Sequence, residues 1–222
     1  MKNLILVRHG QTAMNAKGRL QGLTDVPLNK KGQQSAYQVQ KILAPIPLTI
    51  AYSSDLSRAH ETAEIILTNR QPAVPLLTSS LLREYYFGSL EGQSDMQIFS
   101  HAITSYGLKN TFSYWHQHQG FPLMVESFAA ADPTKQAEDY TTLKNRAEMI
   151  LQQLHTDQHQ GNVLLVAHSV LLSMLIYLVA PSKLPRTLLR NTSVSILTPT
   201  NSGFNTNGIN LSNTNEIRQR LT

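Results

Sequence analysis

The stretch LILVRHGQT, Leu4 to Thr12, decides the fold of this 222-residue chain. Its first four residues are apolar, and so short an apolar run is typical of a strand that is buried on both faces of a sheet. The run ends at Arg8 and His9, directly before Gly10. Ligands of open α/β sheets bind beyond the carboxyl ends of the strands. The stretch therefore predicts a buried strand that delivers a cation and an ionisable ring to a binding site.

Strand-like and helix-like segments alternate along the rest of the chain. Further strands are predicted at LTIAYSS, VLLVAH and TSVSIL. Helices are predicted at 30–43, at 140–154 and at 170–179, and one more helix begins after Ser54 or Asp55, either of which can be its N-cap. Asn207-Gly208 is a hairpin signal. Strands separated by helices predict an α/β fold with a mostly parallel central sheet and helices on both faces, built as one domain over residues 1–222.

Composition limits the classes of function. The chain has no cysteine, which excludes disulfides, a thiolate nucleophile and cysteine-type zinc sites. A net charge of +5 favours an anionic partner, but the lysines and arginines are scattered and form no patch of the kind that nucleic-acid binding needs. The apolar runs are too short or too interrupted for a signal peptide or a membrane span. We expect a cytoplasmic, soluble protein with no nucleic-acid or membrane partner.

Three predicted strand ends bring chemistry-bearing side chains to one sheet edge. Arg8 and His9 follow the first strand, Arg58 comes shortly after the second, and His168 ends VLLVAH. Glu84 joins them from the segment LLREYYFGSLEG. An arginine in the first turn of a helix is disfavoured by the helix dipole unless an anion lies there, which points to an anion site.

A metal site is not expected. The segment WHQHQ, 115–119, places two histidines at i and i+2 without nearby carboxylates or a third ligand, which is weak evidence for zinc. We expect neither a metal nor a cofactor.

The motifs resemble those of the histidine phosphatase superfamily, the phosphoglycerate-mutase-like enzymes. The similar blocks are LVRHGQTAMN, GRLQGLTDVPLNKKGQQSA, YSSDLSRAHETAEII, LREYYFGSLEG and LLVAHS, which stand in the family's order. The resemblance assigns the catalytic site to Arg8, His9, Arg58, Glu84 and His168, and the substrate pocket to Asn15, Gln21, Gly22 and Ser169. Relatives usually have glycine where this chain has Ser169. The resemblance also implies a cap-like helical insertion at about 94–140.

The chemistry that the resemblance implies needs no metal. Neutral His9 would attack phosphorus and form a phosphohistidine, while Arg8, Arg58 and His168 hold the phosphoryl oxygens. Glu84 would protonate the leaving alkoxide and then take a proton from the attacking water.

The insertion separates the two leading functions. Mutase relatives usually hold a substrate carboxylate with an arginine pair there, but residues 94–140 contain only Lys109 and Lys135 as permanent cations. The insertion also has large apolar residues that suit an aromatic leaving group or form the core of a helical cap: Phe112, Tyr114, Trp115, Phe121 and Met124. A phosphatase acting on a small phosphorylated substrate is therefore expected. A phosphoglycerate mutase, a silent phospho-ligand binder and a nucleic-acid binder stay as alternatives, and substrate and oligomeric state stay open.

Overall fold

A computed structural model describes residues 3–94, 120–157, 160–185 and 187–221. Its centre is a six-stranded sheet in the order β3-β2-β4-β1-β5-β6. Neighbouring strands are parallel from β3 through β1, and β5 and β6 are antiparallel. The bounds are β1 Leu4–Arg8, β2 Leu48–Ser54, β3 Leu76–Ser79, β4 Asn162–Ala167, β5 Val194–Thr200 and β6 Gly203–Leu211. The predicted mostly parallel α/β fold is confirmed.

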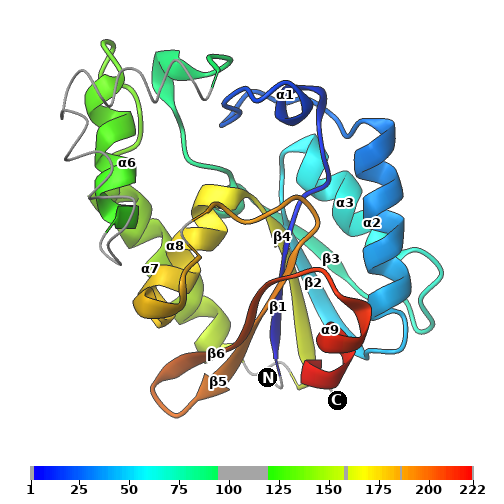
Figure 1. Cartoon of the computed structure of the whole chain (residues 1–222). Coiled ribbons are helices and arrows are strands. Elements are labelled where there is room, and N and C mark those ends of the chain that lie inside the picture. The colour runs from blue at the N-terminus through cyan, green and yellow to red at the C-terminus, as the bar shows by residue number, and fades with distance from the viewer. Residues whose placement is uncertain (1–2, 95–119, 158–159, 186, 222) are drawn as a thin grey trace.

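Helices cover both faces of the sheet (Figure 1). One face carries α2 (Lys30–Leu43), α3 (Ser57–Leu67) and α9 (Thr214–Leu221), and the other carries α6 (Gly120–Ala131), α7 (Tyr140–Thr156) and α8 (Ser169–Val179). Shorter elements are α1 (Ala13–Ala16) and the 3-10 helices η1 (Ser80–Leu82), η2 (Gly88–Leu90) and η3 (Pro181–Lys183). The helices predicted at 30–43, 140–154 and 170–179 are confirmed to within about two residues at their ends.

Strand β1 explains why the sheet is covered twice. Successive side chains of a strand point to opposite faces. Leu4 and Leu6 accordingly belong to the core beneath α7 and α8, whereas Ile5 and Val7 belong to the core beneath α2 and α3. Burial of apolar surface on both sides is the main force that holds these layers together.

Strand register sets the position of the site. Arg8 at the end of β1 pairs with Ala167 at the end of β4, and Ser53 near the end of β2 pairs with Val166. The residues that follow these three strands therefore emerge at one edge of the sheet, as the sequence predicted.

The predicted cap of α3 is wrong. The helix begins after Leu56, which makes no side-chain capping bond. The Ser54 hydroxyl accepts from the Leu56 amide, at 3.2 Å, which precedes the first turn of the helix. The carboxylate of Asp25 lies at the helix start instead, where its Oδ1 accepts from the Ser57 amide at 2.9 Å and from the Ser57 hydroxyl at 2.7 Å. A residue 32 positions away has taken the role that a local pattern assigned to Ser54 or Asp55.

The predicted hairpin turn at Asn207-Gly208 is also wrong. Both residues lie inside β6, and the turn falls at 201–202. The register of β5 and β6 shifts between Ile196, which pairs with Gly208, and Leu197, which pairs with Thr206. Asn207 is therefore the extra residue of a β-bulge. Arg220 on α9 fixes this bulge, because its Nη1 donates to the Asn207 carbonyl at 2.7 Å and its own carbonyl accepts from the Asn207 amide group at 2.9 Å.

The insertion expected at about 94–140 is described from residue 120 onward. Phe112, Tyr114 and Trp115, together with Lys109 and the WHQHQ segment, lie outside the described residues. Phe121 is buried, with its ring centroid 5.6 Å from that of Tyr177, and Met124 packs against the same core. Phe121 therefore packs α6 against α8, and Met124 adds to the same core.

Within the described ranges, no helix combines the length and the apolar character that crossing a membrane requires.

Candidate active site

His9 follows β1 and is almost fully buried. Its Nδ1 lies 2.7 Å from the carbonyl oxygen of Gly10. Because a carbonyl oxygen only accepts, Nδ1 carries the proton in the neutral ring, and the lone pair stays on Nε2. Burial, followed by the positive charges of Arg58 and Arg8, lowers the pKa of His9 well below its usual range. At neutral pH His9 is an uncharged imidazole with a free Nε2.

His168 lies beside His9 at the end of β4. The two ring centroids are 5.0 Å apart, and His168 is fully buried. Neither of its ring nitrogens has a hydrogen-bond partner among the residues that the structure describes. Burial and the charge of Arg58 lower the pKa of His168 well below its usual range, so this ring is also neutral near pH 7. Two neutral imidazoles with unused nitrogen atoms thus share one buried space.

Arg58, the second residue of α3, is fully buried. Its guanidinium donates from Nη2 to the Gly22 carbonyl at 2.6 Å and from Nη1 to the Thr24 carbonyl at 3.0 Å. Burial lowers its pKa to about 10, against the opposing charges of Glu84, Asp25 and Glu91. Arg58 therefore stays cationic at neutral pH and presents its charge to both histidines.

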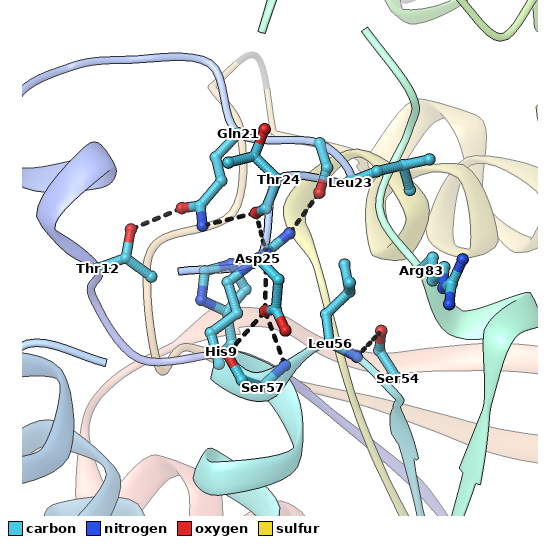
Figure 2. A network of polar contacts seen from close by, with 12 residues as sticks. His9, Thr12, Gln21, Leu23, Thr24, Asp25, Ser54, Leu56, Ser57 and Arg83 are labelled. Carbon is cyan, nitrogen blue, oxygen red and sulfur yellow. Dashed lines mark hydrogen bonds and ion pairs between the residues drawn. The ribbon is translucent and has the colours of Figure 1, made fainter. Parts of the chain in front are cut away.

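Asp25 supplies the negative charge at the start of α3. Its Oδ1 lies 4.0 Å from Nη1 of Arg58. Figure 2 shows the same carboxylate in contact with Ser57. A carboxylate of the chain itself therefore offsets the helix dipole and the arginine together. The position of Arg58 in a first helical turn does not by itself require a bound anion.

Glu91 holds the loop that contacts Arg58. Its carboxylate accepts from the Leu23 amide at 2.7 Å and from the Thr24 amide at 2.8 Å. A Cβ at Gly22 would come within 2.5 Å of both Glu91 Oε1 and the Tyr85 carbonyl oxygen. Only glycine fits here without a shift of the backbone. This close packing holds the Gly22 carbonyl in the position in which it accepts from Arg58.

Glu84 caps a helix that belongs to another part of the chain. His168, the N-cap residue of α8, makes no side-chain capping bond. The buried carboxylate of Glu84 replaces it, since its Oε1 accepts from the amides of Val170 and Leu171, at 3.1 and 3.0 Å, and from its neighbour Tyr85 at 2.9 Å. Its Oε2 accepts from Val170 alone among these amides, at 3.0 Å. A helix N-terminus attracts a carboxylate, and this places Glu84 next to the His168 backbone.

Arg8 and Ser169 share an acceptor in the loop before β5. Nη1 of Arg8 donates to the carbonyl of Leu189, and the Ser169 hydroxyl donates to the same oxygen at 3.3 Å. The serine in the place of the usual glycine is thus buried and bonded to the loop that also holds Arg8.

Asn191 in that loop was not predicted. Its side-chain nitrogen donates to the His9 carbonyl at 3.1 Å and to Oδ1 of Asn15 at 3.2 Å. A single asparagine in a loop carries no local signal that would reveal this contact, since its partners lie 182 and 176 positions away.

The remaining predicted pocket residues belong to one network with Thr12. Thr12 caps α1, where its hydroxyl accepts from the Asn15 amide at 3.2 Å and donates to Oε1 of Gln21 at 2.6 Å. Gln21 in turn donates to the Thr24 carbonyl at 3.2 Å (Figure 2). Asn15, Gln21 and the Arg58 loop are therefore one connected structure, and their contact with a substrate stays a prediction.

Gly10 allows the His9 loop to lie against α2. A Cβ at Gly10 would approach the Gly32 carbonyl oxygen to 2.7 Å, and the Gly10 amide donates to the Thr62 hydroxyl at 3.0 Å. The glycine after the histidine is thus needed for close packing.

A cavity of about 450 Å³ lies beside Glu84. Most of the residues that line it are polar or charged, and they come from three segments: Leu23; Ser80, Arg83, Glu84 and Tyr86; and Gln136, Ala137, Glu138, Asp139, Thr142 and Arg146. Over the ranges that the structure covers, no group of three histidine or acidic residues is placed to hold a metal ion.

Comparison with known proteins shows to which family the chain is similar. The model of the histidine phosphatase superfamily (branch 1) matches residues 4–212. The chain is 30% identical to "Probable phosphoglycerate mutase GpmB" of Escherichia coli O1:K1 / APEC, over 88% of this chain and 84% of that protein. It is 28% identical to adenosylcobalamin/alpha-ribazole phosphatase of Escherichia coli K12, over 78% and 76%.

A solved structure gives the same result for the fold. The crystal structure of phosphoglycerate mutase from Bacillus anthracis superposes with a TM-score of 0.87 at 27% identity, covering 100% of this chain and 97% of that one. The family model spans nearly the whole chain, and the relatives are phosphatases and mutases. The chain belongs to the histidine phosphatase superfamily, branch 1.

Proposed function

We propose that the chain is a metal-independent phosphomonoesterase that acts through a phosphohistidine on His9. The observation that carries the proposal is the contact between His9 Nδ1 and the Gly10 carbonyl. This contact places the proton on Nδ1, so Nε2 keeps a free lone pair. The charges of Arg58 and Arg8 act on the same ring and would attract an anionic phosphate ester. A neutral, oriented imidazole beside fixed positive charge is the arrangement that nucleophilic attack on a phosphate ester needs.

In the first step, His9 Nε2 attacks phosphorus as the bond from phosphorus to the leaving oxygen breaks. Arg8 and Arg58 stabilise the negative charge of the phosphoryl oxygens, and His168 adds a polar contact from its unpartnered ring. Asn15, Gln21, Gly22 and Ser169 complete the substrate pocket in this proposal. A phosphohistidine results, and the leaving oxygen needs a proton.

Glu84 provides that proton. Its Oε1 accepts from three backbone amides, whereas Oε2 accepts from one of them, so Oε2 is the oxygen better placed to carry a proton. In the second step the Glu84 carboxylate takes a proton from water, and the resulting hydroxide displaces His9 from phosphorus. Free phosphate and neutral His9 are regenerated.

A trapping experiment tests the proposal. After mixing with a labelled phosphomonoester and rapid acid-free quenching in base, wild type should carry label on a histidine, and His9→Gln should carry none. Turnover of the ester by His9→Gln at more than a few per cent of the wild-type rate would show that another group attacks phosphorus. Binding without any turnover by wild type would support the silent phospho-ligand binder.

The second candidate function is a phosphoglycerate mutase, which the likeness to GpmB and to the Bacillus anthracis mutase favours. The two functions differ in what accepts the phosphate. Wild type supplied with 3-phosphoglycerate and 2,3-bisphosphoglycerate should release free phosphate faster than it forms 2-phosphoglycerate, because residues 94–140 contain no arginine to hold the substrate carboxylate. Faster isomerisation would replace the phosphatase with the mutase.

The natural substrate in this proposal is a small phosphorylated metabolite rather than a nucleic acid. The cytoplasmic location and the cap-like insertion that the sequence predicts stay predictions, which cell fractionation and deletion of residues in 95–119 would test.

A further inference from the structure

Arg146 on α7 is a largely buried cation that packs against the loop that carries Glu84. Its side chain is 15% exposed and the side chain of its partner Glu138 is 10% exposed. The guanidinium binds the Glu138 carboxylate in bidentate fashion, from Nε at 3.0 Å and from Nη2 at 2.6 Å. This ion pair fixes the guanidinium in the orientation in which its third nitrogen makes further contacts.

The remaining nitrogen, Nη1 of Arg146, donates to two backbone carbonyls. One belongs to Leu81, at 2.9 Å, and the other to Arg83, at 2.7 Å. Both residues lie just before Glu84, Leu81 inside η1 and Arg83 directly after it. On the other side of Glu84, the backbone amide of Glu138 donates to the Tyr86 carbonyl at 2.8 Å. The arginine and its acidic partner therefore hold the backbone on both sides of the proposed acid.

We propose that Arg146, with Glu138, is a positioning residue for Glu84, an inference that rests on the proposed phosphatase function. The Glu84 carboxylate bonds to the amides at the start of α8. The short side chain can reach these amides only while the backbone of Glu84 stays in place, so a shift of that backbone would move the carboxylate. Arg146 touches neither Glu84 nor His9 in any contact of the structure's described part. It acts on the backbone that orients the acid, and a planar fork with fixed donors suits this task better than a lysine.

A structural ion pair alone would predict something different. Loss of a purely stabilising pair lowers stability and affects all substrates alike. Loss of the acid's position should instead affect esters according to their leaving group, since p-nitrophenolate departs without a proton and an alkoxide does not. The ratio of the two kcat/KM values separates the two roles.

The test compares Arg146→Met, Arg146→Lys and wild type on β-glycerophosphate and p-nitrophenyl phosphate. For Arg146→Met, kcat/KM for the alkyl ester should fall at least about tenfold more than kcat/KM for the aryl ester. Arg146→Lys keeps the charge that also acts on His168 but cannot make all four bonds, and it should show the same preference to a smaller degree. Lys144→Met, which removes an exposed cation paired with Glu148 on the same helix, is the matched control and should change neither value.

The charge-swapped variant Arg146→Glu with Glu138→Arg sharpens the result. It keeps an ion pair but places a carboxylate beside the carbonyls of Leu81 and Arg83, so the loss on the alkyl ester should persist. Equal losses on both esters in Arg146→Lys, or restoration of the alkyl-ester rate by the swap, would overturn the positioning role while leaving the phosphatase intact. Wild type that turns over neither ester would overturn the proposed function and the positioning role with it.

Discussion

The stability of the protein should fall steeply as the pH drops below about 6.5, because two buried histidines resist protonation. Burial and the arginine charges lower the pKa values of His9 and His168 in the folded state. In the unfolded chain each histidine has an ordinary pKa near 6.5 and takes up a proton as the pH falls. The unfolded state then binds more protons than the folded state, so the free energy of unfolding decreases toward acid pH.

The magnitude follows from linkage. Each histidine that stays neutral in the folded state costs about 1.4 kcal/mol between about pH 7.5 and pH 5.5. The two together account for about 2.7 kcal/mol, a sizeable part of the 5–15 kcal/mol that a typical domain has. Above about pH 7.5 both states bind no proton at these sites and the contribution disappears.

The assay is denaturant unfolding at a series of pH values in a buffer free of phosphate, since a bound anion would favour the charged rings. His168→Gln and His9→Gln each remove one titrating ring. The quantity to compare is the decrease in the free energy of unfolding between about pH 7.5 and about pH 5.5. In each variant this decrease should be smaller than in wild type by about 1.4 kcal/mol, whatever the stability of the variant at about pH 7.5. Parallel curves for wild type and both variants would refute the reasoning, because they would mean that the rings titrate alike in both states.

Three other predictions concern activity and packing. Chelator treatment should leave ester hydrolysis unchanged, because Arg8 and Arg58 supply the positive charge; loss of activity that magnesium or zinc restores would contradict this. Glu84→Gln should lower kcat/KM for an alkyl phosphate by about 10²-fold or more and for p-nitrophenyl phosphate far less, as steady-state kinetics would show, and equal losses would remove Glu84 from the acid role. Gly10→Ala should destabilise the fold by about 1–3 kcal/mol, because the new Cβ would lie 2.7 Å from the Gly32 carbonyl oxygen; a thermal unfolding curve that matches wild type would show that the loop can shift.

Local pattern predicted the strands β1, β2, β4 and β5 and the helices α2, α3, α7 and α8, but neither the edge strand β3 nor the helix α9. The four apolar residues before Arg8 predict a buried strand, and the strand indeed divides its side chains between two cores. In α7, Leu143, Ala147, Ile150 and Leu154 repeat at the three-four spacing of one helical face, and all four are buried. Since the carboxyl ends of parallel strands meet at one edge, the sequence also predicted that His9 and His168 lie together, and their rings are 5.0 Å apart.

Tertiary structure alone decided which groups hold those side chains. Asp25 rather than Ser54 or Asp55 caps α3, and Glu84 caps α8 from 86 positions away. Arg146 stands three residues after the buried Leu143 and four before the buried Ile150, which places it beside the buried face of α7. Nothing nearby in the chain reveals the carbonyls that it binds. Periodicity records which face of an element is buried. It carries no information about polar partners, because a backbone amide or carbonyl left without a bond at a helix end or loop is satisfied by whatever donor or acceptor the packed elements bring to it.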